Sequence, residues 1–478
     1  MVPPPDDDHD CGWKAYAKAQ EARFEKQLEV NKALLERLES VEKRLAGHKS
    51  EKRKATKLPP PMPKSATRPE ETAPSLRETV ETELVPVPLP PEQCTCPKCG
   101  STEMRAVGSG TPSTLLEYVH PHFRRRIFVR ETRSCRCGHI ITAPAPPRVG
   151  EGTRYSPSFV AHLVVSKCNE SMAQYRLAKS YRQLGIPIAR STMCDLFHRA
   201  ARELRPLHAA ALALVPAAGL VHADETSIRQ QGLGKSAFLW TFVTGDVIAY
   251  EYATTRSGSV PQKILGDSTG YLVVDQYTGY NAVTAPGRRV RVGCFAHVRR
   301  KLHEQLERHP ELGVGLDMIG GLYAIEHDIV EAKQRGSPVH LEARRARARP
   351  ILATLLRWAR HHLRLHEPRS AVGRALRYLL GNFRELTRFT RDARIPLDNN
   401  VAESSLRRIA LGRKNYLFAG SEEAGHDLAC LYTLVASCEK HGVNPLAYLT
   451  DVLVRVQEHP DSRVADLLPH RWKLRAAP

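Results

Sequence analysis

Three acidic residues stand where folding would gather them into one site. Asp224 follows the short apolar run at residues 220–223, and Asp275 follows a similar run at residues 271–274. Such runs are typical of buried strands, which would deliver each acid to the edge of a sheet. Glu403 lies far downstream, where the pattern becomes helical. Three converging carboxylates predict a site that holds two divalent cations, Mg²⁺ or Mn²⁺, against a phosphodiester.

Neighbouring acids have alternative roles. Glu225 adjoins Asp224, but side chains alternate along a strand, so only one of the two can face the site. The preceding apolar run favours Asp224. Asp398 is expected to cap the helix that carries Glu403. Asp246 is expected to be a turn residue between two strands.

Four cysteines have the spacing of a structural zinc site. Cys96 and Cys99 form a Cys-x-x-Cys pair, and Cys135 and Cys137 form a Cys-x-Cys pair, each followed by glycine. Two strands, at residues 115–119 and 123–132, would form a hairpin that brings the pairs together. Four thiolates suit Zn²⁺, although the short second spacing leaves Cys94 as a rival ligand. The alternative is a small metal-free module with reduced cysteines.

Basic side chains near these motifs are candidates for contacts with DNA phosphates. They are Arg124, Arg125, Arg126, Arg299, Arg300, Arg413 and Lys414. The first three are equally consistent with a solvated strand face. His297 and Arg300 are equally consistent with a structural role where a strand ends. Arg413 and Lys414 follow a glycine and lie close to Glu403 in the sequence.

The composition points to a polyanionic partner. The 478 residues include 71 Lys and Arg against 51 Asp and Glu, a net charge of +20. Such an excess favours nucleic acid, although a basic protein can also be merely soluble. Residues 1–10 lack the apolar core of a signal peptide, and the longest uncharged apolar stretch, residues 209–221, is too short to span a bilayer. The eleven cysteines fit a reducing cytoplasm, so we expect a cytoplasmic, nucleoid-associated protein.

The chain divides into segments of different character. Residues 20–46 predict a helix with a leucine-zipper-like seam, which favours self-association, although a solvated helix would show a similar pattern. Residues 47–91 are charged and rich in proline and predict an extended linker. The cysteine module covers residues 92–145. Residues 155–207 are helical and resemble a helix-turn-helix, with Ser191 as the cap of the second helix, although helical hairpins also occur in domains that touch no DNA.

The central part predicts a mixed α/β fold. Three antiparallel strands are followed by a helix, a strand, a helix-like segment and a strand, which is the ribonuclease-H-like order. The predicted catalytic core comprises residues 218–300 and 396–420. An all-helical insertion covers residues 301–395, where an arginine-rich stretch is either a solvated helix face or the lining of a DNA channel. A helical segment at residues 421–478 caps the core.

The chain resembles the transposases of the insertion-sequence-66 family over nearly its whole length. The matching phrases are Asp224-Glu225-Thr226, Asp275-x-Tyr277-x-Gly279-Tyr280, Cys294-x-Ala296-His297-x-Arg299-Arg300, Asp398-Asn399-Asn400-x-Ala402-Glu403 and Gly412-Arg413-Lys414-Asn415-x-Leu417-Phe418-x-Gly420-Ser421. Their order and spacing together are specific. The resemblance implies DNA transposition by an acidic triad, with Asp224 and Asp275 as the strand acids and Glu403 as the helix acid. The implied partners are the terminal inverted repeats and target DNA, a second copy of the chain, and accessory proteins of the same element.

Three functions therefore remain open. The first is a transposase that cuts and joins DNA. The second is a nuclease of the same fold that cuts without joining. The third is a DNA-binding protein with an inactive core, although the presence of all three acids weighs against it.

Overall fold

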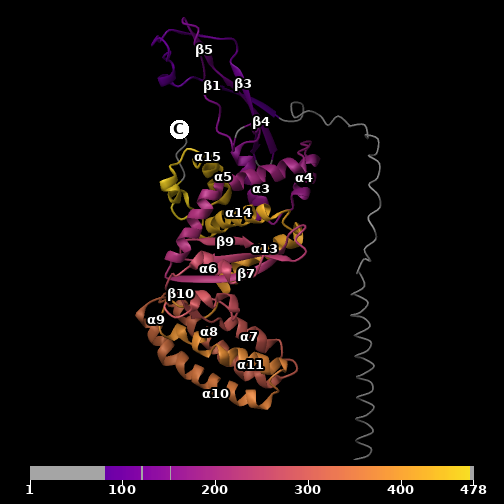
Figure 1. Cartoon of the computed structure of the whole chain (residues 1–478), viewed down its shortest axis with the longest axis vertical. Helices are drawn as coiled ribbons and strands as arrows, with labels where there is room; N and C mark the ends of the chain where they lie inside the picture. Colours follow the sequence, from indigo (N-terminus) through magenta and orange to yellow (C-terminus); the bar gives the residue numbers. More distant parts are fainter. Residues whose placement is uncertain (1–80, 120–121, 151, 474–478) are drawn as a thin grey trace, which may run out of the picture. The chain divides into compact units, whose positions relative to one another are not determined.

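The computed structural model describes residues 81–119, 122–150 and 152–473 (Figure 1). The predicted zipper-like helix at residues 20–46 and most of the predicted linker lie outside these residues. Along the described chain, no helix is both long enough and apolar enough to cross a membrane.

The cysteine module consists of two three-stranded sheets, with the orders β1-β4-β3 and β2-β5-β6. Their strands are β1 (Glu81–Val87), β2 (Met104–Ala106), β3 (Thr111–Val119), β4 (His122–Arg130), β5 (Thr132–Cys135) and β6 (Ile140–Thr142). The prediction of an unpacked linker is wrong for β1, which pairs in parallel with β4. Pro86 is tolerated there because β1 is an edge strand, where a missing N–H breaks no ladder.

Three helices follow the module: α3 (Pro157–Cys168), α4 (Gln174–Gln183) and α5 (Arg190–Ala217). The predicted helix-turn-helix pair corresponds to α4 and the start of α5. The prediction that Ser191 caps the second helix is wrong, because the N-cap is Ala189 and has no side-chain cap bond. Ile186 and Ile188 are buried in the connecting turn, so packing fixes where α5 begins. The helix then continues for 28 residues into the central part of the chain.

A five-stranded mixed sheet with the order β11-β10-β7-β8-β9 forms the centre. Its strands are β7 (Leu220–Arg229), β8 (Ser236–Val243), β9 (Ile248–Ala253), β10 (Tyr271–Val273) and β11 (Val290–Val292), and the α-helix α6 (Ser259–Leu265) lies between β9 and β10 in the sequence. β7, β8 and β9 are antiparallel, whereas β10 pairs in parallel with both β7 and β11. The predicted mixed α/β fold is confirmed, and Asp246 lies in the turn between β8 and β9 as predicted.

Two helices from the end of the chain cover this sheet, and a third follows them: α13 (Asn400–Asn415), α14 (Glu422–Lys440) and α15 (Pro445–Arg455). α13 contacts β7 and β8, and α14 contacts β9. Thr433 and Ser437 of α14 accept hydrogen bonds from the backbone N–H groups of Tyr250 and Ile248, at 2.9 and 3.1 Å. These bonds satisfy donors that edge strand β9 would otherwise leave unpaired.

The helical insertion packs around a second hydrophobic core, which it shares with Val273 of β10 and Val292 of β11. It follows α7 (Phe295–His303) and contains α8 (Gly313–Glu331), α9 (Pro338–Ala343), a π-helix (Arg344–Ala348), α10 (Arg349–Leu365), α11 (Ala371–Gly381) and α12 (Phe383–Leu386). α8, α10 and α11 lie side by side (Figure 1).

The idea that the arginine-rich stretch lines a DNA channel is wrong for Arg344, whose side chain is only 1% exposed. Its guanidinium binds both carboxylate oxygens of Glu326 at 2.7 Å and donates to the carbonyl of Phe389. A buried cation requires such partners, so Arg344 serves to hold the insertion together.

Candidate active site

The two strand acids are brought together by the pairing of β7 with β10. The register places Tyr271 opposite Leu220 and Val273 opposite His222. Continued by two residues, the same register aligns Asp275 with Asp224. The prediction that Asp224 ends its strand is wrong, because β7 continues to Arg229. Only the shorter β10 ends before its acid. Asp224 therefore lies just beyond the part of β7 that pairs with β10, in the part that pairs with β8 alone.

Asp224 is held in an environment that disfavours its charge. It is half-buried, and its Oδ1 accepts a hydrogen bond from the Glu225 backbone N–H at 2.9 Å. Burial, and then the negative charges of Glu225, Asp275 and Glu403, raise the pKa of the Asp224 carboxyl to about 7. Asp275 and Glu403 therefore both lie close enough to Asp224 to act on its carboxyl electrostatically.

Glu225, the neighbour of Asp224, is held in a hydrogen-bond network. Its Oε1 accepts two hydrogen bonds from Arg256, at 2.8 and 2.6 Å, and its Oε2 accepts one from the Tyr280 hydroxyl at 2.7 Å. Arg256 also lies over the Tyr277 ring, 4.2 Å from its centroid. This network fixes the loop that follows Asp275, and both oxygens of Glu225 are used in doing so.

Glu403 lies in the first turn of α13 and is half-buried. Arg300 donates to its Oε2 at 2.8 Å, and Nδ1 of His297 lies 3.4 Å from its Oε1. The sequence analysis left Arg300 between a phosphate contact and a structural role. The structure places it, with His297, against the third candidate acid.

Asn399 was missed by the sequence analysis. It is 1% exposed, and its side chain donates to the Ala223 carbonyl at 2.9 Å and lies 2.9 Å from Nδ1 of His222. These contacts tie the start of α13 to β7 one residue before Asp224. The prediction that Asp398 caps this helix is wrong, because the N-cap residue is Asn399. Asp398 lies one position earlier and accepts a hydrogen bond from the backbone N–H of Asn400 at 3.0 Å. The place of Asn399 beside Asp398, just before the helix of Glu403, was the only signal in the sequence.

Asn399→Ala is expected to lower the free energy of unfolding by about 2 kcal/mol, because it leaves the buried His222 and Ala223 groups without partners. Chemical denaturation followed by circular dichroism measures this change. Asn400→Ala is the matched control, since Asn400 is exposed and its side chain binds only Asp398. An equal loss in both variants would contradict the anchoring role of Asn399.

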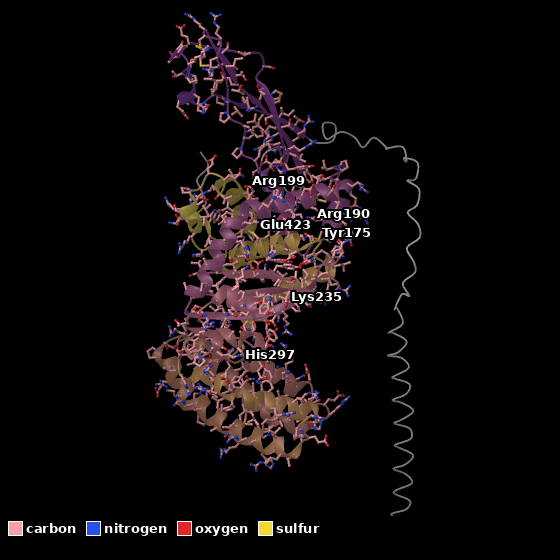
Figure 2. The ribbon with its side chains drawn as sticks, viewed as in Figure 1. Tyr175, Arg190, Arg199, Lys235, His297 and Glu423 are labelled. Carbon is pink, nitrogen blue, oxygen red and sulfur yellow. The ribbon has the colours of Figure 1, made fainter. Side chains whose placement is uncertain are left out.

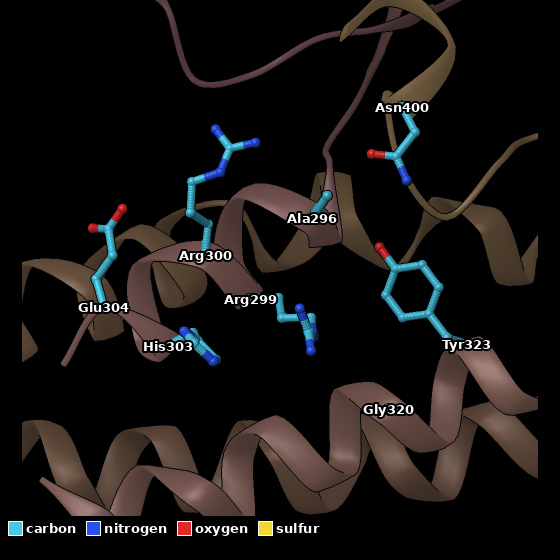
Figure 3. A pocket seen from close by; sticks show the side chains of 8 residues that line it. All are labelled: Ala296, Arg299, Arg300, His303, Glu304, Gly320, Tyr323 and Asn400. Atoms are coloured by element: carbon cyan, nitrogen blue, oxygen red, sulfur yellow. The ribbon is translucent and has the colours of Figure 1, made fainter. Parts of the chain in front are cut away.

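A cavity of about 610 Å³ lies between α7 and α8, and Arg300, the partner of Glu403, is among its lining residues (Figure 3). Arg299, Arg300 and His303 of α7 line one side, and Tyr323 of α8 lines the other. Arg300 thus belongs both to the cavity and to the pair with Glu403. Two arginines and a histidine at the rim of an acidic site are suited to the phosphates on either side of a reacting bond.

The remaining basic candidates differ in their surroundings. Arg413 donates to the Thr226 hydroxyl at 2.9 Å and to the Ser227 carbonyl at 2.6 Å, so it already fastens the end of α13 to β7. Lys414, its neighbour, is exposed.

The three arginines of β4 have partners on neighbouring strands. Arg124 and Arg126 lie 3.2 and 3.4 Å from Glu83 of β1, and Arg126 lies 2.6 Å from Glu117 of β3. Arg125 donates to the Thr82 hydroxyl at 2.7 Å. Much of the positive charge that suggested a DNA contact is therefore offset locally.

The four predicted cysteines form one cluster. Sγ of Cys96 lies 3.4 Å from that of Cys137, and Sγ of Cys99 lies 3.1 Å from that of Cys135. Burial would raise the pKa of Cys96, but backbone amides and neighbouring thiols lower it to about 6.

The loops around these cysteines explain how the cluster forms. Gly100 and Gly138 adopt φ values of +71° and +81°, which lets each chain turn tightly behind its pair. The pairs are joined by the β2-β5-β6 sheet rather than by the predicted β3–β4 hairpin. Cys94 lies outside the cluster, with its Sγ 3.5 Å from the Pro90 carbonyl.

Three groups of potential metal ligands occur among the described residues, and in each the ligand atoms lie within 4.8 Å of one another. The groups are Cys96, Cys99, Cys135 and Cys137; Cys294, His297 and Glu403; and His309, Glu311 and His366. Within this part of the chain, Asp224, Asp275 and Glu403 do not form a group of this tightness.

Two acids on a mixed sheet, followed by a helix that carries a third, are the arrangement that the sequence analysis expected of a transposase. Comparison with protein families agrees with this class. Residues 152–427 match the family described as "Transposase IS66 family", and residues 433–470 match the "IS66 C-terminal element". The chain belongs to the IS66 family of transposases. The first match includes all three candidate acids, and the cysteine module precedes it.

Similar proteins occur in Sinorhizobium fredii (strain NBRC 101917 / NGR234). The uncharacterized protein y4hP is 29% identical over 81% of this chain and 75% of its own length. The uncharacterized protein y4jD is 29% identical over 80% of this chain and 79% of its own length. The uncharacterized protein y4qI is 28% identical over 86% and 79%.

Proposed function

We propose that this protein is a DNA transposase that binds the terminal inverted repeats of an insertion sequence, cuts at its ends and joins them to target DNA. Asp224, Asp275 and Glu403 are the proposed catalytic, metal-binding acids. The observation that carries the proposal is the pairing of β7 with β10, which aligns Asp275 with Asp224. The link from Asn399 to the same strand brings the helix of Glu403 to that edge.

The topology supports the proposal. Three antiparallel strands, followed by two that extend the sheet in parallel beyond the first, correspond to the ribonuclease-H-like order. In this interpretation the catalytic core comprises β7 to β11 with α13, and the helical insertion separates β11 from the helix of Glu403.

The residues fit a hard divalent cation in donor chemistry. Three carboxylates supply oxygen ligands. Burial, and then the negative charge of neighbouring acids, raises the pKa of Asp224, and a bound cation would favour the ionised form of this carboxyl. Mg²⁺ or Mn²⁺, two per site, would lower the pKa of an attacking water or 3′-hydroxyl and stabilise the departing 3′-oxygen. Arg300 holds one oxygen of Glu403, and Arg299 and His303 are placed to bind flanking phosphates.

The cysteine cluster fits structural zinc, because four sulfur atoms converge from two tight turns. Cys96, Cys99, Cys135 and Cys137 are the proposed ligands. We also propose that α4, α5 and Lys414 contact double-stranded DNA. Four arginines that now bind partners within the protein would contact DNA by exchanging those partners for phosphate: Arg124, Arg125, Arg126 and Arg413. The two DNA ends of an element favour a homo-oligomer with one active site for each end.

A strand-transfer assay with pre-cut element ends and Mg²⁺ tests this function. Joining of the ends to target DNA is the expected result. Cleavage without joining would instead identify a nuclease, and DNA binding without either reaction would identify an inactive DNA-binding protein. DNA ends of scrambled sequence serve as the control.

Asp224→Asn is expected to raise the melting temperature of the metal-free protein at about pH 8 more than at about pH 5. In the unfolded chain Asp224 ionises near its ordinary pKa of 3.8, whereas in the folded protein its pKa is about 7. Through this window the folded state keeps a proton that the unfolded chain has lost, so stability falls as pH rises. The asparagine side chain does not ionise, so the variant does not lose stability in this way as the pH rises. Thermal unfolding of both proteins across pH measures the gap, and a gap that stays constant would contradict the shift.

A further inference from the structure

A second cluster of metal-ligating side chains adjoins the proposed catalytic acids. Cys294 precedes α7 as its N-cap residue, His297 lies in the first turn of α7, and Glu403 lies in the first turn of α13. Their Sγ, ring nitrogen and carboxylate oxygen all lie within 4.8 Å of one another. Figure 2 labels His297 at the junction of the central sheet with the helical insertion. Two helix starts therefore supply three ligands of different chemistry.

The ligand atoms of this cluster are available for a cation. His297 Nδ1 and Glu403 Oε1, 3.4 Å apart, are both buried and make no hydrogen bond within the described chain. Arg300 binds the other oxygen of Glu403, which leaves Oε1 turned toward His297. Cys294 is 1% exposed, and its Sγ accepts the backbone N–H of Asn399 at 3.2 Å. His297 Nδ1 and Glu403 Oε1 face one another as an ion pair when His297 is protonated, but neither makes a hydrogen bond within the described chain. Buried polar atoms without a hydrogen bond are unusual, and a cation bound between the neutral imidazole and the carboxylate would satisfy both.

The donor set selects the kind of cation. Sulfur and imidazole nitrogen suit a borderline-soft ion such as Zn²⁺, whereas Mg²⁺ prefers oxygen ligands. We propose that Cys294, His297 and Glu403 form a binding site for a zinc-class divalent cation, with the fourth position open to water. Three protein ligands with one open position is an arrangement that Zn²⁺ commonly adopts.

Occupation of this site would affect the catalytic acids, because Glu403 belongs to both sets. A Zn²⁺ ion held by Cys294 and His297 would also bind Glu403 and so withdraw it from the magnesium site. Free zinc would therefore be a reversible inhibitor of DNA cleavage, an effect that we call the zinc brake. This consequence rests on the proposed function, whereas the binding of zinc does not.

Cobalt spectroscopy tests the binding directly. Protein whose cysteine module already carries zinc is titrated with Co²⁺, and the thiolate-to-cobalt charge-transfer band is recorded. The wild type is expected to bind one further equivalent and to show this band. Cys294→Ser should lose the band and bind Co²⁺ at least about tenfold more weakly. Cys430→Ser, which changes a buried cysteine outside the cluster, is the matched control and should keep it.

Two further variants separate the possible failures. His297→Gln should weaken Co²⁺ binding as Cys294→Ser does, which keeps the test decisive if Cys294→Ser does not fold. Asp275→Asn should keep the cobalt band, because it changes only the proposed magnesium site. Identical cobalt spectra and zinc content in the wild type, Cys294→Ser and His297→Gln would overturn the site. Strand transfer retained by Asp275→Asn would remove Asp275 from the proposed magnesium site and leave the cobalt result standing. Absence of both cleavage and strand transfer in the wild type would refute the proposed function and would likewise leave the cobalt result standing.

The brake is measured by titrating free Zn²⁺ into strand-transfer reactions that contain Mg²⁺. The zinc concentration that halves each protein's own activity is expected to be about tenfold higher for Cys294→Ser than for the wild type. Equal zinc sensitivity in the two proteins would overturn the brake.

Discussion

Asp275→Asn is expected to reduce both strand cleavage and strand transfer by about a thousandfold or more, while DNA binding remains nearly intact. Asp275 follows the short strand β10, and its Oδ1 accepts the Tyr277 backbone N–H at 2.8 Å. An amide keeps the size of the side chain and can keep that contact, but it removes a charged ligand. The loss of several kcal/mol of transition-state stabilisation corresponds to a rate effect of this size.

Asp246→Asn is the control for this experiment, since Asp246 is an exposed acid in the turn between β8 and β9. It undergoes the same chemical change on the same sheet and should keep its activity. Cleavage rates on labelled element ends, with mobility shifts for binding, give both readouts. Substantial residual cleavage by Asp275→Asn would remove this residue from the metal site.

The double variant Cys96→Ser, Cys99→Ser is expected to lose one zinc ion per chain and the ordered structure of the cysteine module. The module consists of two small sheets with few buried side chains, so its hydrophobic core is limited. Structural zinc contributes about 10 kcal/mol or more to such a unit. Metal analysis measures the zinc, and limited proteolysis measures whether residues 92–145 become susceptible.

Cys94→Ser is the matched control for the zinc experiment, because Cys94 lies outside the four-sulfur cluster. It should keep both the zinc and the resistance to protease. If the double variant carries as much zinc as the parent protein, the cluster does not bind zinc.

The central sheet could be predicted because its evidence is local. Each strand is a short apolar run, and the acids are found by their place after two of these runs. The alignment of Asp275 with Asp224 then follows from parallel pairing of the two strands. The continuation of β7 beyond Asp224 could not be predicted in this way. Local pattern reveals where a strand lies, whereas its length depends on the partner strand.

Contacts between distant segments could not be predicted. Arg344 reads as one of several arginines on a charged helix, yet Glu326, 18 positions away, and the carbonyl of Phe389 make it a buried residue. Asn399 reads as one polar residue among several, and its role depends on β7, about 176 positions away. Likewise, β1 appears unstructured in the sequence because its stability comes from β4. In each case the contact is made with another element that is distant in the sequence. The periodicity of a single segment gives no information about such contacts.

The helical insertion also decides when the proposed catalytic site becomes complete during synthesis. A nascent chain that has emerged as far as β11 already contains two of the three acids, but the last acid follows some hundred residues later. The insertion shares one hydrophobic core with β10 and β11. Because segments that share a core tend to fold as a unit in the order of their emergence, we expect this unit to fold before α13 docks. A polypeptide interrupted on the ribosome before α13 is synthesised would lack the third proposed catalytic acid, since Glu403 lies in about the last sixth of the sequence.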